Sequence, residues 1–296
     1  MKGIFARRSV IFQSGVLLTA VLIGYFAATI FTIPLLLLHT GGKTVPVNEQ
    51  PVSMLSAIQL IAAVCIFLLP AVGTAWLCSE RPRLFLHISP SHRNSKLLLP
   101  VACTLLLFAP TISLTSYLNS LLTFPEWMAP VEQWMKAMEA AAAELTHRML
   151  SQKGILALGS NLIVIAVVAG VTEEFIFRGT LFSILQKAIK NHHIVIWVVA
   201  ILFSAIHFQF YGFIPRMLLG AYLGYLLYWT QNIRIPVFAH ILHNAIAVVG
   251  MSTDSFKDHV FFAETIPAED LVWFSAVALI SFIFFIAGTA WIRKTA

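Results

Sequence analysis

The chain has 296 residues, of which 59% are hydrophobic and only 11% are charged. Soluble domains carry about 25% charged residues, so this composition excludes an ordinary soluble protein and indicates a polytopic membrane protein. The formal net charge of +6 follows from the placement of basic and acidic loops, and it does not indicate a nucleic-acid partner.

Apolar windows long enough to cross a bilayer define the predicted elements in chain order. Each crossing needs about 20 apolar residues. The candidate spans are 11–38, 53–78, 97–122, 156–178, 194–211, 213–230, 233–250 and 270–292. The sequence shows no internal repeat and no linker between these segments. We therefore expect an all-α protein of about eight transmembrane helices, forming a single membrane domain over residues 1–296.

The first span is longer than the core of a signal peptide, which has roughly 7–15 apolar residues, and no small-residue cleavage site follows it. We expect it to be retained. Most basic residues then fall on one side of the membrane: Lys2, Arg7, Arg8, Arg81, Arg83, Arg93, Lys96, Lys187, Lys190, Arg234, Arg293 and Lys294. The exceptions are Lys43, Lys136, Arg148, Lys153 and Lys257. The positive-inside rule predicts an integral protein of the inner or plasma membrane with both termini in the cytoplasm.

Between the third and fourth spans lies a segment with a different pattern. Apolar residues recur at helical spacing after Pro125, and charged residues occupy the other faces. The apolar positions are Trp127, Val131, Trp134, Met138, Leu145 and Met149. We expect an additional amphipathic helix near 125–150 that lies on the outer membrane interface, either as a surface spacer or as a lid over lateral substrate entry.

The fourth span ends in "GVTEEFIFRG", residues 170–179, which places three ionisable side chains in an apolar helix. Each charge in the middle of a span costs roughly 2.5–3.5 kcal/mol and needs a partner or a water-filled cavity. Glu174 and Arg178 are four residues apart, in the order that favours an ion pair. Glu173 points about 140° away from Arg178. The spacing leaves Glu173 without a counterion in its own helix, unless all three groups form a polar staple between helices.

Three histidines also fall inside predicted spans: His207, His240 and His243. If the hairpin between the fourth and fifth spans turns near Lys190, Glu173 lies 17 residues before the turn and His207 lies 17 residues after it. Both would then lie about 25 Å from the turn, at one depth. In the seventh span Asn244 follows His240 by one helical turn, so both side chains can reach one ligand atom.

These residues form three motifs: Glu173-Glu174-x-x-x-Arg178, Phe203-x-x-x-His207 and His240-x-x-x-Asn244. In this order they resemble the signatures of the CAAX prenyl protease type II and bacteriocin-processing family of intramembrane endopeptidases. The resemblance covers roughly a third of the chain and implies a catalytic core over residues 156–250. It also implies hydrolysis of a peptide bond in a membrane-associated or lipidated protein or peptide.

Amide hydrolysis needs an activated water and donors for the developing oxyanion. We assign Glu173 as the general base that holds the water, with His207 as its second partner, and the family resemblance points to the same pair. Glu174 and Arg178 would orient and neutralise the site.

His240 and Asn244 suit the oxyanion hole, whereas His243 is expected to have a supporting role. A rival chemistry uses zinc, because His207, His240 and Glu173 form an acceptable catalytic ligand set. The compact zinc motif H-E-x-x-H is absent from the sequence, and Glu173 could not act as the base if it bound metal. We therefore expect a mechanism that requires no cofactor.

Two other functions fit the composition. The first is a non-proteolytic membrane scaffold or bacteriocin-immunity protein that keeps the fold and binds a partner through its charged core. The second is a proton-coupled transporter, which the missing internal repeat disfavours. The bilayer and a membrane-associated protein or peptide are the partners that we expect.

Overall fold

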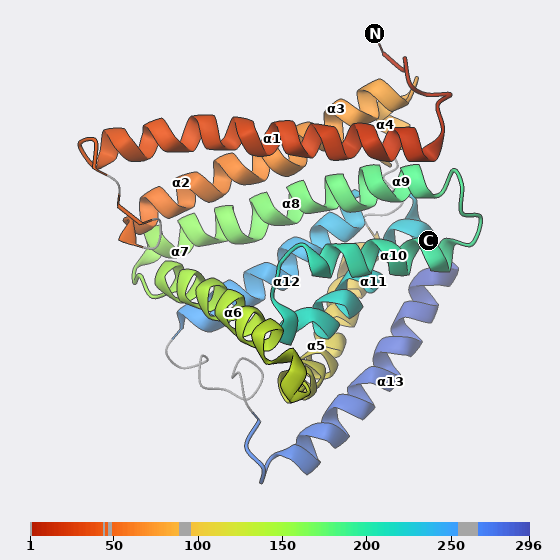
Figure 1. Cartoon of the computed structure of the whole chain (residues 1–296). Helices are drawn as coiled ribbons and strands as arrows, with labels where there is room; N and C mark the ends of the chain where they lie inside the picture. The colour runs from red at the N-terminus through yellow and green to blue at the C-terminus, as the bar shows by residue number, and fades with distance from the viewer. Residues whose placement is uncertain (1, 44, 47–48, 89–95, 254–265) are drawn as a thin grey trace.

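The structure is a computed structural model, and it describes residues 2–43, 45–46, 49–88, 96–253 and 266–296 (Figure 1). Arg93 and Lys257, which entered the orientation argument, lie outside these ranges. Within them, seven helical segments are long and apolar enough to cross a membrane, and a shorter apolar helix takes the eighth place. The expected all-α architecture of about eight membrane helices is confirmed.

The helices of the first half are α1 (Val10–His39), α2 (Val52–Ala62), α3 (Leu69–Cys78), α4 (Pro82–Phe85), α5 (Leu98–Ser120) and α6 (Ala129–Leu150). Those of the second half are α7 (Ile155–Asn161), α8 (Ala169–Glu174), α9 (Phe182–Leu185), α10 (His192–Ala205), α11 (Phe213–Thr230), α12 (Arg234–Ser252) and α13 (Leu271–Thr295). Three short π-helical stretches join α2 to α3, α7 to α8 and α8 to α9: Ala63–Leu68, Leu162–Val168 and Phe175–Leu181. Helices α2 and α3 therefore form one continuous span, and α7, α8 and α9 form another.

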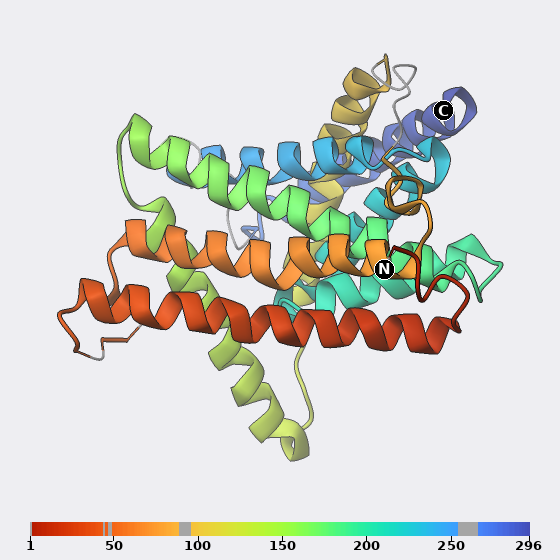
Figure 2. The ribbon, with the colours of Figure 1, turned by 90° about the horizontal axis from the view of Figure 1, so that it is seen from above.

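The spans pack as a bundle around the α7–α9 segment. Helix α1 lies along the α2–α3 span, which in turn contacts the α7–α9 segment, and α12 packs on another side of that segment (Figures 1 and 2). Helices α10 and α11 pack against each other as a hairpin, and α13 packs along α5. The site described below therefore lies among helices that meet near the centre of the bundle.

Helix α1 approaches the α2–α3 span closely at a glycine. A Cβ atom added to Gly24 would overlap the carbonyl oxygen of Cys65, which lies in the π-helical stretch Ala63–Leu68. Small residues at helix contacts allow such close backbone packing in membranes, where van der Waals contact replaces the hydrophobic effect between helices. Gly24 therefore determines how closely α1 can approach its neighbour.

Gly24→Ala is expected to destabilise the protein by about 1–3 kcal/mol, because α1 must shift away from Cys65. Thermal unfolding in detergent measures the effect. Gly15→Ala is the matched control, since Gly15 lies in the same helix with no neighbouring atom within 4 Å of its added Cβ. Equal melting midpoints for the two variants would contradict the packing account.

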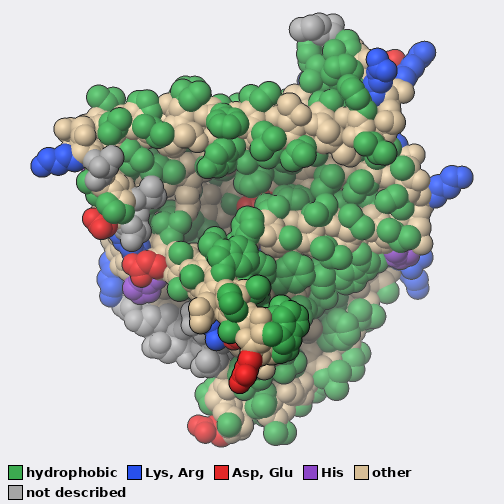
Figure 3. Space-filling model, in the orientation of Figure 1, with side chains coloured by type: hydrophobic (Ala, Val, Ile, Leu, Met, Phe, Trp, Pro, Cys, Tyr) green, Lys and Arg blue, Asp and Glu red, His purple; other side chains and the backbone are tan. Residues whose placement is uncertain are grey.

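Several segments that carry basic residues meet at one end of the bundle. The backbone amides of Gly3 and Phe5 donate to the carbonyls of Trp76 and Leu77 at the end of α3, each over 2.9 Å. Lys187, just past α9, donates to Gln13 Oε1 over 2.6 Å. The two termini lie at this same end in Figure 1. In Figure 3 hydrophobic side chains cover most of the face in view, with most Lys and Arg side chains at its edges. That this end faces the cytoplasm stays a prediction.

The predicted amphipathic segment near 125–150 forms a helix. A 3₁₀ turn at Glu126–Met128 leads into α6, which crosses the other helices obliquely, and one end of α6 projects from the bundle in Figure 2. Its last residues, Met149 and Leu150, are buried, whereas Trp127 is 79% exposed. The C-terminal end of α6 is therefore buried in the bundle, whereas the turn that precedes the helix is exposed.

The fifth predicted span, 194–211, is too long. Helix α10 ends at Ala205, and Phe208 has a φ of 52°, in the left-handed region that a helix does not use. The apolar run continues past this point, so hydropathy could not reveal the break. His207 was expected inside a transmembrane helix and instead lies in the turn that follows α10.

Candidate active site

The ion pair expected in the fourth span is present and sealed from solvent. Arg178 Nη1 donates to Glu174 Oε1 over 2.7 Å, and both side chains are fully buried. Arg178 Nη2 donates to the carbonyl of Gly220 in α11 over 2.8 Å, and the guanidinium lies 4.6 Å from the ring centre of Phe203 in α10. Arg178 thus fixes its own span against the α10–α11 hairpin.

His240 of α12 completes this buried network. Its Nδ1 lies 2.9 Å from Glu174 Oε1, so the carboxylate oxygen that binds Arg178 also binds the imidazole. Because an ionised carboxylate only accepts hydrogen bonds, His240 Nδ1 carries the proton. Gly170 makes this approach possible, since a Cβ there would lie 2.9 Å from Ile241 Cγ1. The other nitrogen, Nε2, is directed at Glu173, 3.8 Å from its Oε2.

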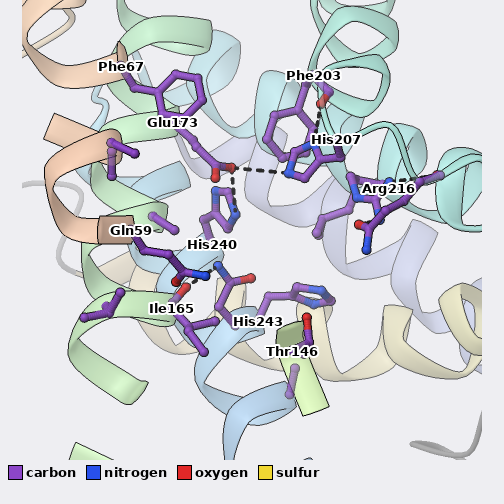
Figure 4. Close-up of a pocket in the computed structure, with 18 of the residues that line it drawn as sticks. Gln59, Phe67, Thr146, Ile165, Glu173, Phe203, His207, Arg216, His240 and His243 are labelled. Carbon is purple, nitrogen blue, oxygen red and sulfur yellow. Dashed lines mark hydrogen bonds and ion pairs between the residues drawn. The ribbon is translucent and has the colours of Figure 1, made fainter. Parts of the chain in front are cut away.

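Glu173 has a different environment from its neighbour. Its side chain lines a cavity of about 570 Å³ and stays 14% exposed, and its Oε2 lies 4.0 Å from His207 Nε2 (Figure 4). This distance and the 3.8 Å between Glu173 Oε2 and His240 Nε2 both exceed the length of a hydrogen bond. The predicted meeting of Glu173 and His207 at one depth is confirmed, although His207 reaches that depth from a turn.

The orientation of His207 follows from the preceding helix. Its Nδ1 lies 2.8 Å from the carbonyl oxygen of Phe203, and a carbonyl can only accept, so Nδ1 carries the proton in the neutral ring. Nε2 is then an acceptor that faces Glu173. The Phe203 ring also packs edge-on against His207 and His240, with centroids 5.2 and 5.7 Å apart. Phe203 therefore contacts both histidines and the cation of Arg178.

Asn244 lies on the cavity wall one turn beyond His240. Its Nδ2 donates to the carbonyl of Ile165 over 3.1 Å. Ile165 belongs to the π-helical stretch Leu162–Val168. An amide nitrogen has two hydrogens, so this bond fixes Asn244 while leaving a second donor. His243 also lines the cavity. Its supporting role stays a prediction.

Arg216 and Gln59 are among the cavity residues that sequence reasoning missed. Arg216, at the start of α11, donates from both terminal nitrogens to Gln209, over 2.6 Å to Oε1 and 3.2 Å to the backbone carbonyl. Gln59 comes from α2. An arginine inside an otherwise apolar span was a usable signal for Arg216, whereas nothing in the sequence marks Gln59.

The possible zinc ligands named from the sequence are His207, His240 and Glu173. In the ranges given above, no three His, Cys, Asp or Glu side chains are grouped as ligands of one metal ion would be. His240 Nδ1 is engaged by Glu174, and its Nε2 and that of His207 both face Glu173.

Similarity to known proteins falls in the segment that carries most of this site. Residues 156–246 match the family model of the type II CAAX prenyl endopeptidases, Rce1-like. The resemblance to this family is confirmed. The matched segment contains all three motifs and covers α7 to most of α12. The matched model describes a family of endopeptidases.

Two curated relatives match a stretch of similar length. The membrane-embedded CAAX protease MroQ of Staphylococcus aureus and the uncharacterized protein YpbD of Bacillus subtilis are each 28% identical over 90 residues. The match spans 29% of this chain, 36% of MroQ and 43% of YpbD. No solved structure matches the chain. Helices α1 to α6 and α13 lie outside the segment that matches the family model.

Proposed function

We propose that this protein is an intramembrane endopeptidase that cleaves a membrane-associated or lipidated protein or peptide with a water activated by Glu173 and His207. One observation carries the proposal. Glu173 has no cation within hydrogen-bonding distance among the described residues, lines the cavity and faces two histidines, whereas the adjacent Glu174 is neutralised and sealed. Two neighbouring carboxylates thus have separate tasks.

The distances suit a water molecule bound between two acceptors. Glu173 Oε2 and His207 Nε2 are 4.0 Å apart, so one water can donate a hydrogen to each over an ordinary hydrogen-bond length. In the proposed step Glu173 takes one proton while the water oxygen attacks the carbonyl carbon. The proton then passes to the leaving amide nitrogen as the C–N bond breaks, which restores the carboxylate. General acid–base help of this kind contributes roughly 10²–10⁴-fold in rate.

The developing oxyanion needs donors on the opposite side of the carbonyl. The second N–H of Asn244 and the Nε2 edge of His240 both reach the cavity and are the proposed donors. Each is fixed from behind, Asn244 by the carbonyl of Ile165 and His240 by Glu174. Donors that are held in place before reaction stabilise the oxyanion without reorganisation. His240 would donate from Nε2 in its imidazolium form, in which Nδ1 also donates to Glu174.

A zinc mechanism would use His207, His240 and Glu173 as ligands, and would supply a metal-bound hydroxide in place of the carboxylate-bound water. In the metal-free proposal, cleavage by the purified protein survives incubation with 1,10-phenanthroline. The control is a zinc endopeptidase treated in the same vessel, which must lose activity. Loss of cleavage that added zinc restores would replace the metal-free step by the zinc step.

The experiment that tests the function compares protein termini in membranes of cells that contain the wild-type protein or Glu173→Gln at matched levels. Mass spectrometry is expected to find termini present only with the wild type, which would also identify the substrates. Identical termini in both membranes would favour the scaffold or immunity function, in which the charged core binds a partner without cleaving it.

A further inference from the structure

The turn that carries His207 is held from outside the catalytic core. Between the end of α10 at Ala205 and the start of α11 at Phe213, the only regular structure is a 3₁₀ turn at Phe210–Gly212. Phe208 lies in the same connection, before the 3₁₀ turn, and adopts a left-handed backbone conformation with a φ of 52°. The connection over residues 206–212 is called the His207 turn below. Such a conformation costs about 1–3 kcal/mol in a residue other than glycine and persists only when its surroundings impose it.

Helix α5 binds the far end of the turn. Asn119 is 2% exposed, and its Nδ2 donates to the carbonyl of Phe210 over 2.9 Å. Its Oδ1 accepts from the backbone amide of Ile214 over 3.0 Å. One side chain thus satisfies an acceptor of the turn and an unpaired amide of the first turn of α11.

Helix α6 binds the middle of the same turn. Glu139 Oε2 accepts a hydrogen bond from the backbone amide of Tyr211 over 3.2 Å. Five residues earlier in α6, the Trp134 ring contacts Phe208 and Phe210, with centroid distances of 6.4 and 5.2 Å. The amphipathic helix is therefore joined to the His207 turn by one polar and two aromatic contacts.

We propose that Glu139 and Asn119 are positioning residues for catalysis: they hold the turn so that His207 Nε2 faces Glu173. Neither residue reaches the reacting atoms. Both lie outside the segment 156–246 that resembles the CAAX endopeptidases, so this role belongs to the part of the chain that the family match does not cover. The proposal rests on the proposed function, because it names what places one of the two groups that hold the water.

The test uses the full-length protein in vesicles and a peptide that spans a cleavage site found in cells. Glu139→Ala is expected to lower kcat by about 10²-fold with KM unchanged, because small displacements of a catalytic group have effects of this size. Glu139→Gln keeps an acceptor oxygen for the Tyr211 amide and is expected to restore most of the activity. Glu144→Ala, an exposed carboxylate of the same helix, is the matched control.

Hydrogen exchange gives a second readout that does not depend on activity. In Glu139→Ala, peptides covering residues 206–212 are expected to exchange faster while those of α8 and α12 keep their wild-type rates. Unchanged kcat in Glu139→Ala, a change in KM alone, or a Glu139→Gln variant as slow as alanine would each overturn the positioning role. In each of these cases an inactive Glu173→Gln would leave the proposed function standing, whereas absence of cleavage by the wild type would contradict the function itself.

Discussion

Glu173→Gln is expected to reduce peptide cleavage by roughly 10³-fold while leaving the fold intact. Glutamine has nearly the same shape and still binds water, but it cannot take the proton. Stability should change little, because the Glu173 carboxylate faces the cavity and the two imidazoles that it faces lie 3.8 and 4.0 Å away, beyond hydrogen-bond length. The measurements are kcat on a substrate peptide and the thermal unfolding midpoint.

Glu144→Gln makes the same chemical change at an exposed site on α6 and is the control for expression and charge. If Glu173→Gln cleaved at a rate within a few-fold of the wild type, Glu173 would not be the base. A fall in activity together with a large fall in the unfolding midpoint would assign Glu173 to the structure of the protein.

Arg178→Met is expected to have the opposite signature, a large loss of stability. It removes the cation from a fully buried pair, and breaking such a pair costs about 3–5 kcal/mol. Glu174 would keep only His240, and the carbonyl of Gly220 would lose its donor. Thermal or denaturant unfolding of the purified protein measures the change.

The double variant Glu174→Gln with Arg178→Met separates charge from packing. It leaves no unpaired charge at the buried pair, so we expect it to regain part of the lost stability. We expect it to remain impaired in cleavage, because His240 is no longer held by a carboxylate. A single Arg178→Met variant as stable as the wild type would contradict the account of this network.

The sequence predicted the parts of the site that depend on spacing within one helix. The Glu174–Arg178 pair followed from a separation of four residues, and it is present. The approach of Glu173 to His207 followed from equal distances to a hairpin, and it is also present. Both arguments needed only the rise and period of an α-helix.

Contacts between distant spans were beyond that reasoning. His240 was expected to act beside Asn244, yet its Nδ1 is bound by Glu174, 66 residues earlier in the chain. The break after Ala205 was hidden because Ile206, Phe208 and Phe210 keep the window apolar on average around His207 and Gln209. The π-helical stretches were hidden for a similar reason, since hydropathy reports burial in lipid and is the same for an α- and a π-helical turn.

The most direct test of the account is whether this chain alone cleaves a peptide. The purified wild-type protein is placed in vesicles of defined lipids with a synthetic peptide that spans a terminus found in cells, and the products are identified by mass spectrometry. The account predicts cleavage at the same bond as in cells, and none with Glu173→Gln. An intact peptide with well-folded wild-type protein would contradict it, since another enzyme would then have produced the cellular termini.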